Sequence, residues 1–239
     1  MTLKVINITG EFEPVNPFES RYLRQLGILS PEEYLDKKIV LIGAGGIGSH
    51  VAHELARMGI SFNVFDHDDV EDHNLSNQLG YQERDLGFKK TEALLLSMPD
   101  YCVNNNNYIA LFWQGQQCEE IVISGVDSMN AREEIWQYIK NNPTVKLYID
   151  ARMGGEVYQV FAIDPCNAAH IAKYEETLGR VVDPDPCTER AIAYNLFGVA
   201  SKIGKVVQCY LRGKKFSNSI YEDIRGVELG RSLLFYEKW

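Results

Sequence analysis

The stretch from Lys38 to Ser49, KIVLIGAGGIGS, constrains the fold more than any other part of this chain. Its first residues are apolar and rich in β-branched side chains, which predicts a buried strand. Gly43, Gly45 and Gly48 then form a G-x-G-x-x-G turn, and apolar residues recur after it at helical spacing. A helix that begins at such a turn presents free N–H groups and the positive end of its dipole, which suits a phosphate. The stretch therefore predicts a nucleotide site, with NAD, FAD and ATP all open.

Composition narrows the class of protein. The chain has 239 residues, a hydrophobic content of 45% and a net charge of −9. This charge argues against a nucleic-acid partner, because phosphate contacts need clustered Lys and Arg. The sequence shows no signal peptide, and no apolar run reaches the ~20 residues of a membrane span. We expect a cytoplasmic protein without membrane or nucleic-acid partners.

The five cysteines, at positions 102, 118, 166, 187 and 209, form no C-x-x-C pair. A structural zinc site of the usual spacing is therefore not expected. An odd number of cysteines without a secretion signal favours free thiols, and at least one of them is then available for chemistry.

A second strand is predicted at Phe62–Asp66, ending in an acid eighteen residues beyond Gly48. That distance is close to the ~20 residues expected for a ribose-binding carboxylate, so a dehydrogenase fits equally well up to this point. The polar stretch from Asp66 to Gln78 distinguishes a dehydrogenase from other nucleotide-binding proteins. Its acids and amides lie at the carboxyl end of a strand, the usual ligand edge of such folds, and a dehydrogenase has no need of them.

The rest of the chain extends the α/β pattern. Lys89 and Lys90 open a helix that continues from Ala93 to Met98, and there they oppose the helix dipole, a conflict that a bound anion would remove. Further strands are expected at 108–113, 120–127 and 145–150, then a sharp turn at 152–155 and an antiparallel strand at 156–163. Helices are expected from Ser128, at 167–178 and at 191–211. The predicted fold class is α/β: a Rossmann-like, mostly parallel sheet with helices on both faces, extended by antiparallel strands near the C-terminal part.

A single domain is expected over residues 1–239. It divides into an N-terminal arm (1–30), a nucleotide-binding core (38–163), a crossover loop with a long helix (164–213) and a tail that forms a small hairpin (214–239).

Five motifs in this order resemble the ThiF/MoeB-type adenylyltransferases, bacterial relatives of ubiquitin-activating enzymes. They are RYLRQ at 21–25, GAGGIGS at 43–49, the D-x-D-x-V-x-x-x-N-x-x-x-Q pattern at 66–78, KKTE at 89–92 and DSMNAR at 127–132. The glycine turn alone is weak evidence of this family, whereas five ordered motifs are strong evidence. The resemblance implies ATP and Mg²⁺ as cofactors and adenylation of the C-terminal carboxylate of a ubiquitin-like or sulfur-carrier protein.

The resemblance also implies roles for individual residues. Asp127 would carry Mg²⁺ between the phosphates, and Arg24 would reach into the site of a neighbouring subunit, which implies a homodimer. Mg²⁺, Lys90 and the helix N-terminus would offset the repulsion between two anions and stabilise departing pyrophosphate. The residues that would bind the nucleotide comprise the glycines of the turn, the two acids near the ribose, and three side chains at the phosphates and the acyl phosphate centre: Gly43, Gly45, Gly46, Gly48, Asp66, Asp68, Asn74, Gln78 and Lys90.

Two positions bear on the activity that this resemblance implies. The family usually has Arg where this chain has Asn77, and Asn supplies no charge. Arg24, Arg84 or Lys89 compensates, or the protein adenylates slowly or not at all. Cys187, followed by Thr188, resembles the cysteine at which ubiquitin-activating enzymes take the carboxylate as a thioester, before a conjugating enzyme receives it.

Three alternatives stay open at this point. The protein could be an inactive platform that binds a ubiquitin-like protein, or an NAD-linked oxidoreductase, which residues 43–66 alone permit. Adenylation of a peptide or small-molecule carboxylate is the third.

Overall fold

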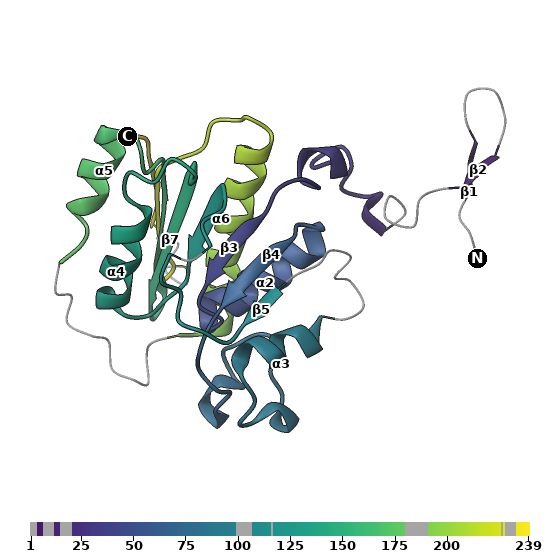
Figure 1. The fold of residues 1–239 in the computed structure, drawn as a ribbon, viewed down its shortest axis with the longest axis horizontal. Coiled ribbons are helices and arrows are strands. Elements are labelled where there is room, and N and C mark those ends of the chain that lie inside the picture. Colours follow the sequence, from purple (N-terminus) through teal and green to yellow (C-terminus); the bar gives the residue numbers. More distant parts are fainter. Residues whose placement is uncertain are drawn as a thin grey trace.

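The fold is built on one eight-stranded sheet, seen in a computed structural model (Figure 1). The structure describes residues 21–98, 107–115, 117–179, 191–225, 227 and 233–239, and the backbone of 4–6 and 12–14. Near the N-terminus, β1 (Lys4–Ile6) and β2 (Phe12–Pro14) pair antiparallel as a separate two-stranded sheet.

The eight strands run in the order β10-β9-β8-β7-β6-β3-β4-β5. Neighbours from β7 to β5 are parallel, and β8, β9 and β10 add antiparallel pairs at the other side. The predicted fold class is therefore confirmed. The strands are β3 (Ile39–Ile42), β4 (Phe62–Phe65), β5 (Asn107–Ile109), β6 (Ile121–Ser124), β7 (Leu147–Gly154), β8 (Val157–Ile163), β9 (Ser219–Asp223) and β10 (Leu233–Glu237).

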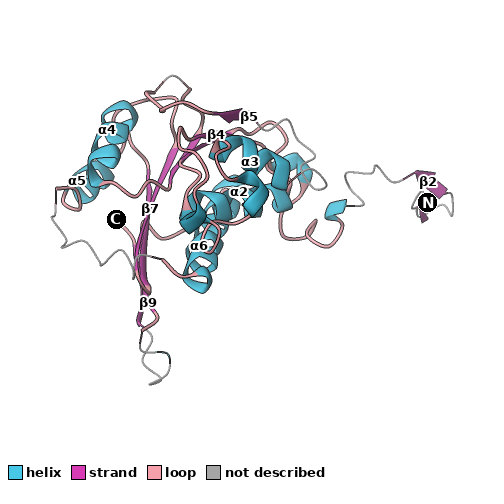
Figure 2. Ribbon diagram, turned by 90° about the horizontal axis from the view of Figure 1, so that it is seen from below, coloured by secondary structure: helices cyan, strands magenta, loops and turns pink. Residues whose placement is uncertain are grey.

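Helices cover both faces of the sheet because its central strands are apolar on both sides. Side chains alternate along β3: Ile39 and Leu41 face one core cluster, whereas Val40 and Ile42 face the other. Figure 2 shows α4 and α5 on one side of the sheet and α2, α3 and α6 on the other. These helices are α2 (Gly46–Met58), α3 (Lys90–Ser97), α4 (Met129–Ile139), α5 (Ala168–Glu175) and α6 (Ala193–Leu211). None of the described helices is long and apolar enough to cross a bilayer.

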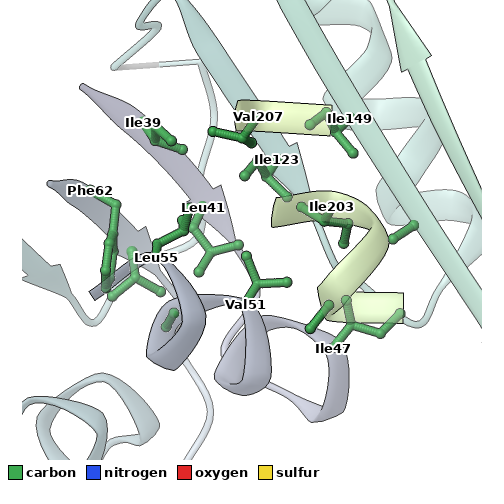
Figure 3. Packing of buried hydrophobic residues seen from close by; sticks show 14 of the residues in the cluster. Ile39, Leu41, Ile47, Val51, Leu55, Phe62, Ile123, Ile149, Ile203 and Val207 are labelled. Atoms are coloured by element: carbon green, nitrogen blue, oxygen red, sulfur yellow. The ribbon is translucent and has the colours of Figure 1, made fainter. Parts of the chain in front are cut away.

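The larger core cluster joins the sheet to α2 and α6 (Figure 3). The two helices pack closely: a Cβ added to Gly204 of α6 would lie 2.2 Å from the carboxylate of Glu54 on α2. Burial of that carboxylate raises the pKa of Glu54 to about 7. At the other end of the pair, a Cβ on Gly46 would lie 3.1 Å from Leu196. The start of α2 is thereby held beside the start of α6.

Several expected boundaries were wrong. The third expected strand, 108–113, is only Asn107–Ile109, where it pairs with the end of β4. The helix expected to open at Lys89 and Lys90 does begin at Lys90, whose N–H donates to the Asp68 carbonyl at 2.9 Å, but it ends at Ser97 instead of Met98. The turn expected at 152–155 comes later, because β7 pairs with β8 as far as Gly154. Before β3, residues Pro31–Glu33 form a single 3-10 turn.

Candidate active site

The candidate site lies at the carboxyl edge of the parallel strands. β3 has β4 on one side and β6 on the other, so the chain order reverses beside β3, and such a point is the usual ligand crevice of an open α/β sheet. Three predicted segments meet this edge: the glycine turn after β3, the acids after β4 and Asp127 after β6.

The glycine turn is tightly folded onto α2. Gly43 has φ +95°, a conformation that favours glycine, and a Cβ on Gly48 would lie 1.9 Å from the Gly43 carbonyl oxygen. A Cβ on Gly45, in contrast, would meet nothing within 4 Å. Gly45 caps α2 without a side chain, and the first turn of α2 holds no acid. No side chain therefore caps the first N–H groups of α2, an arrangement that fits a phosphate.

Three contacts that the sequence does not reveal hold this turn in place. The Tyr81 hydroxyl donates to the Ala44 carbonyl at 2.7 Å, and the Ala44 N–H donates to Oδ2 of Asp66 at 2.7 Å. Gly125, after β6, donates its N–H to the Ile42 carbonyl at 2.9 Å. Its missing side chain matters, because a Cβ there would lie 3.2 Å from the Gly48 nitrogen. Tyr81 and Gly125 therefore belong to the site's framework.

Lys90 lies at the first position of α3 and is buried, with 7% of its surface exposed. Its Nζ lies 2.9 Å from Oδ2 of Asp68. Partial burial alone would raise the pKa of Asp68, but the hydrogen bond and charge of Lys90 outweigh it and lower that pKa below its ordinary value. Lys89 pairs with Asp69 at 2.7 Å. The negative charges of Asp68 and Asp69 offset the two lysine charges at the start of α3. The expected repulsion between these lysines and the helix dipole is therefore reduced by residues of the chain itself.

The two amides predicted at the phosphates differ in their surroundings. Asn74 is buried, and its Oδ1 accepts the Glu71 N–H at 2.9 Å, which caps the short 3-10 helix Asp72–Asn74. The side-chain oxygens of Gln78 and Asn77 are buried without a hydrogen-bond partner among the described residues. Both residues line a pocket of ≈ 190 Å³ between segment 75–81 and the start of α6. Gln78 therefore lines this pocket with a side-chain oxygen that has no partner among the described residues.

The remaining predicted site residues lie in three different places. Asp127 is exposed, just before α4, and the cap of α4 is Ser128, whose hydroxyl oxygen accepts the Ala131 N–H. Arg24 is exposed beside the C-terminal end of α2, where its neighbour Gln25 donates to the Met58 carbonyl at 2.8 Å. The glycine turn is at the opposite end of α2, so Arg24 is remote from the site of its own chain. Cys187 lies outside the described residues.

One cluster of possible metal ligands occurs among the described residues: Asp66, His67 and Asp68. Asp66 already accepts the N–H groups of Ala44 and Asp68, and Asp68 is paired with Lys90. The charge of Lys90 opposes a cation there. Asp127, an exposed hard oxygen ligand at the sheet edge, fits Mg²⁺ better.

A family model described as the ThiF family matches residues 20–192, more than half of the chain. The chain belongs to the ThiF family. The match spans all five motifs, and it confirms the family resemblance of the sequence.

The ThiF-family chain is similar to curated proteins named ubiquitin-like modifier-activating enzyme 5. It is 35% identical over 112 residues to the one from Caenorhabditis briggsae, and 34% identical over 112 residues to that from Caenorhabditis elegans. Each match covers 44% of this chain and 26% of the relative. The matched region is thus about a quarter of the length of these relatives.

Solved structures show the same fold. A crystal structure of PaaA has a TM-score of 0.74 at 19% identity, covering 93% of this chain and 74% of PaaA. Escherichia coli MccB crystallised with ATP has a TM-score of 0.70 at 19% identity, covering 94% and 72%. At these identities the likeness concerns the fold alone.

Proposed function

We propose that this ThiF-family protein uses ATP to adenylate the C-terminal carboxylate of a ubiquitin-like or sulfur-carrier protein. The observation that carries the proposal is the position of three features at the carboxyl edge of the sheet: the start of α2, which no side chain caps, the buried Lys90 and the exposed Asp127. The names of the curated relatives and the ATP complex of MccB support the same activity. Family membership favours it over an NAD-linked oxidoreductase.

The reaction joins two anions. A carboxylate oxygen attacks the α-phosphorus of ATP, an O–P bond forms, and pyrophosphate leaves with the electron pair of the broken bond. The N–H groups at the start of α2 and the Lys90 ammonium would bind the phosphates and stabilise the charge that develops on them. Asp127 would hold Mg²⁺, which supplies Lewis-acid stabilisation of the leaving phosphates when bound. Arg24 would act on the site of a partner copy in a homodimer.

ATP–pyrophosphate exchange tests this proposal directly. Wild-type protein should exchange labelled pyrophosphate into ATP when a carrier protein with a C-terminal glycine is present. Asp127→Ala should lower the rate by about 100-fold, because a bound metal supplies several kcal/mol of charge stabilisation. Asp36→Ala removes another exposed acid, at the opposite edge of the sheet, and should leave the rate unchanged.

Two outcomes would reject adenylation: no exchange by the wild type across a panel of carriers, or full exchange by Asp127→Ala. Asn77, which replaces the family's usual Arg, favours one alternative, an inactive platform that binds a ubiquitin-like protein. Calorimetric titration of the carrier separates the two, since the platform binds the carrier without exchange.

We further propose that Cys187 takes the activated carboxylate. Its thiolate would attack the acyl carbon of the adenylate, a thioester would form, and AMP would leave with the electron pair. The thioester would then pass to a conjugating enzyme. Incubation with carrier and ATP should yield an adduct that thiol reductant cleaves and that Cys187→Ser abolishes while exchange continues. Cys166→Ser, which alters an exposed thiol, should retain the adduct; an adduct that survives Cys187→Ser would refute this step.

A further inference from the structure

A buried charged cluster lies beneath the loop that carries Asp127. Its centre is Asp150 of β7, which is fully buried. Oδ1 of Asp150 accepts from Nε of Arg132 at 2.8 Å, and Oδ2 accepts from Nε of Arg152 at 2.7 Å and from the Tyr174 hydroxyl at 3.1 Å. One carboxylate thus holds two guanidinium groups in the core.

The two arginines hold different parts of the fold. Nη2 of Arg132 donates to the carbonyl oxygens of Val126 and of Ala151, the latter at 3.1 Å. Arg152 instead donates to the carbonyl and hydroxyl oxygens of Thr177, both at 3.0 Å, and lies over the ring of Phe161. Arg132 therefore reaches the site loop, and Arg152 reaches the segment after α5.

Val126 is the residue immediately before Asp127, so its carbonyl marks where the loop leaves β6. Arg132 is buried, with 4% of its surface exposed, and its guanidinium is fixed by Asp150 on one side and by this carbonyl on the other. A planar group with five donors can satisfy a carboxylate and two carbonyls at once, and such a fork has little freedom to shift.

We infer that Arg132 is a positioning residue, which fixes the Asp127 loop so that the Asp127 carboxylate is held ready at the edge of the sheet. The geometry of the loop is independent of any reaction, and the consequence for catalysis rests on the proposed function. Side chains that orient a metal ligand without touching the metal commonly change metal affinity by about 10–100-fold.

Arg132→Lys and Arg152→Lys form a matched pair. Both keep a cation beside Asp150, and both lose a guanidinium fork, but only Arg132→Lys releases the Val126 carbonyl. Hydrogen–deuterium exchange of the unliganded protein, followed by mass spectrometry, measures the exchange rates of the loop amides directly. Amides of residues 125–128 should exchange about 10-fold faster in Arg132→Lys and at the wild-type rate in Arg152→Lys. Equal rates in the two variants would overturn the inference whatever the protein's activity.

The second readout is the magnesium concentration that gives half-maximal ATP–pyrophosphate exchange. It should rise about 10-fold in Arg132→Lys and stay unchanged in Arg152→Lys. If the wild type shows no ATP–pyrophosphate exchange, the proposed function is rejected. The hydrogen–deuterium exchange of residues 125–128 then still tests whether Arg132 fixes the loop. Exchange in the wild type with an unchanged magnesium requirement in Arg132→Lys would reject only the positioning role.

Arg132→Lys removes buried hydrogen bonds, so its folding has to be checked by circular dichroism. If it does not fold, Arg132→Gln replaces it, because Asp150 then keeps Arg152 as its buried counter-ion. The same amides, 125–128, should then lose protection; retained protection would again overturn the inference.

Discussion

Gly48→Ala should lower the melting temperature by roughly 10 °C, the largest stability change expected of a single methyl group at the site. The added Cβ would lie 1.9 Å from the carbonyl oxygen of Gly43 and 2.7 Å from its carbonyl carbon. Both atoms belong to the backbone, and the Gly43 N–H is itself bonded to the Phe65 carbonyl at 2.8 Å. Displacing either atom would distort the backbone, so we expect a loss of about 3 kcal/mol in the free energy of unfolding. Differential scanning calorimetry measures it.

Gly45→Ala is the matched control and tests the site at the same time. Its backbone, at φ −74° and ψ −152°, suits alanine, and the new methyl group meets no atom within 4 Å. Stability should change by less than about 1 kcal/mol. The methyl group projects into the space at the start of α2, however, so ATP affinity measured by titration calorimetry should fall by about 10-fold or more.

These two variants distinguish the role of the glycine turn in folding from its role in ligand binding. A Gly48→Ala protein as stable as the wild type would mean that the turn relaxes away from α2. Unchanged ATP affinity in Gly45→Ala would mean that the phosphates bind elsewhere, and the glycine turn would then be a structural feature of the strand–helix connection alone.

Local sequence was sufficient for several features in which a residue acts on its near neighbours in the chain. Gly59 ends α2 in the left-handed region at φ +83°, as its residue type favours, and Ser128 caps α4 at the position where a helix start is expected. The apolar stretches that form β3, β4 and β6 are buried throughout, which is why they could be recognised as strands between helices. Their order along the chain was enough to predict a carboxyl edge where Asp66 and Asp127 would lie.

Tertiary contacts of the site were not predictable in the same way. Tyr81 reaches Ala44 across 37 residues of sequence, and Arg132 reaches Asp150 across 18. Nothing in the residues around Tyr81 or Asp150 indicates these partners, because the fold alone brings them together. A tyrosine or an aspartate in an apolar stretch signals only that some polar partner has to be found.

Asn74 shows the opposite difficulty, a residue whose local role is easily taken for a ligand role. Amides and acids cap 3-10 and α-helical turns as readily as they bind phosphates. In the structure Asn74 caps its own short helix, and Asp85 accepts the Gln82 N–H at 2.9 Å in a second such turn. Part of the polar character after β4 therefore reflects capping, whereas the role of Gln78 at the phosphates stays a prediction; its side-chain oxygen is buried without a partner among the described residues.

Lys90→Met should reduce ATP–pyrophosphate exchange by about 1000-fold, since removing one preorganised donor from a site costs 10²–10³ and this ammonium is buried. Methionine keeps the apolar stem that packs at the start of α3. Asp68 loses its partner, but its side chain is 51% exposed and water can solvate it, so stability should fall by less than about 1 kcal/mol. Lys89→Met is the matched control: Lys89 is 40% exposed and pairs with Asp69, and its loss should change the rate less than about threefold.

A comparison with Asp68→Asn decides what Lys90 does. If the lysine only holds Asp68 in place, the two single variants and the double variant should all show the same loss, as expected for two residues that act as one unit. If the ammonium contacts the phosphates, Lys90→Met should be slower than Asp68→Asn by at least about 10-fold. We expect the second result. The position of Lys90 at the first turn of α3, beside the acids that follow β4, directs its charge to the edge of the sheet where α2 begins. Equal rates in the three variants would assign Lys90 to the framework of the site, together with Tyr81 and Gly125.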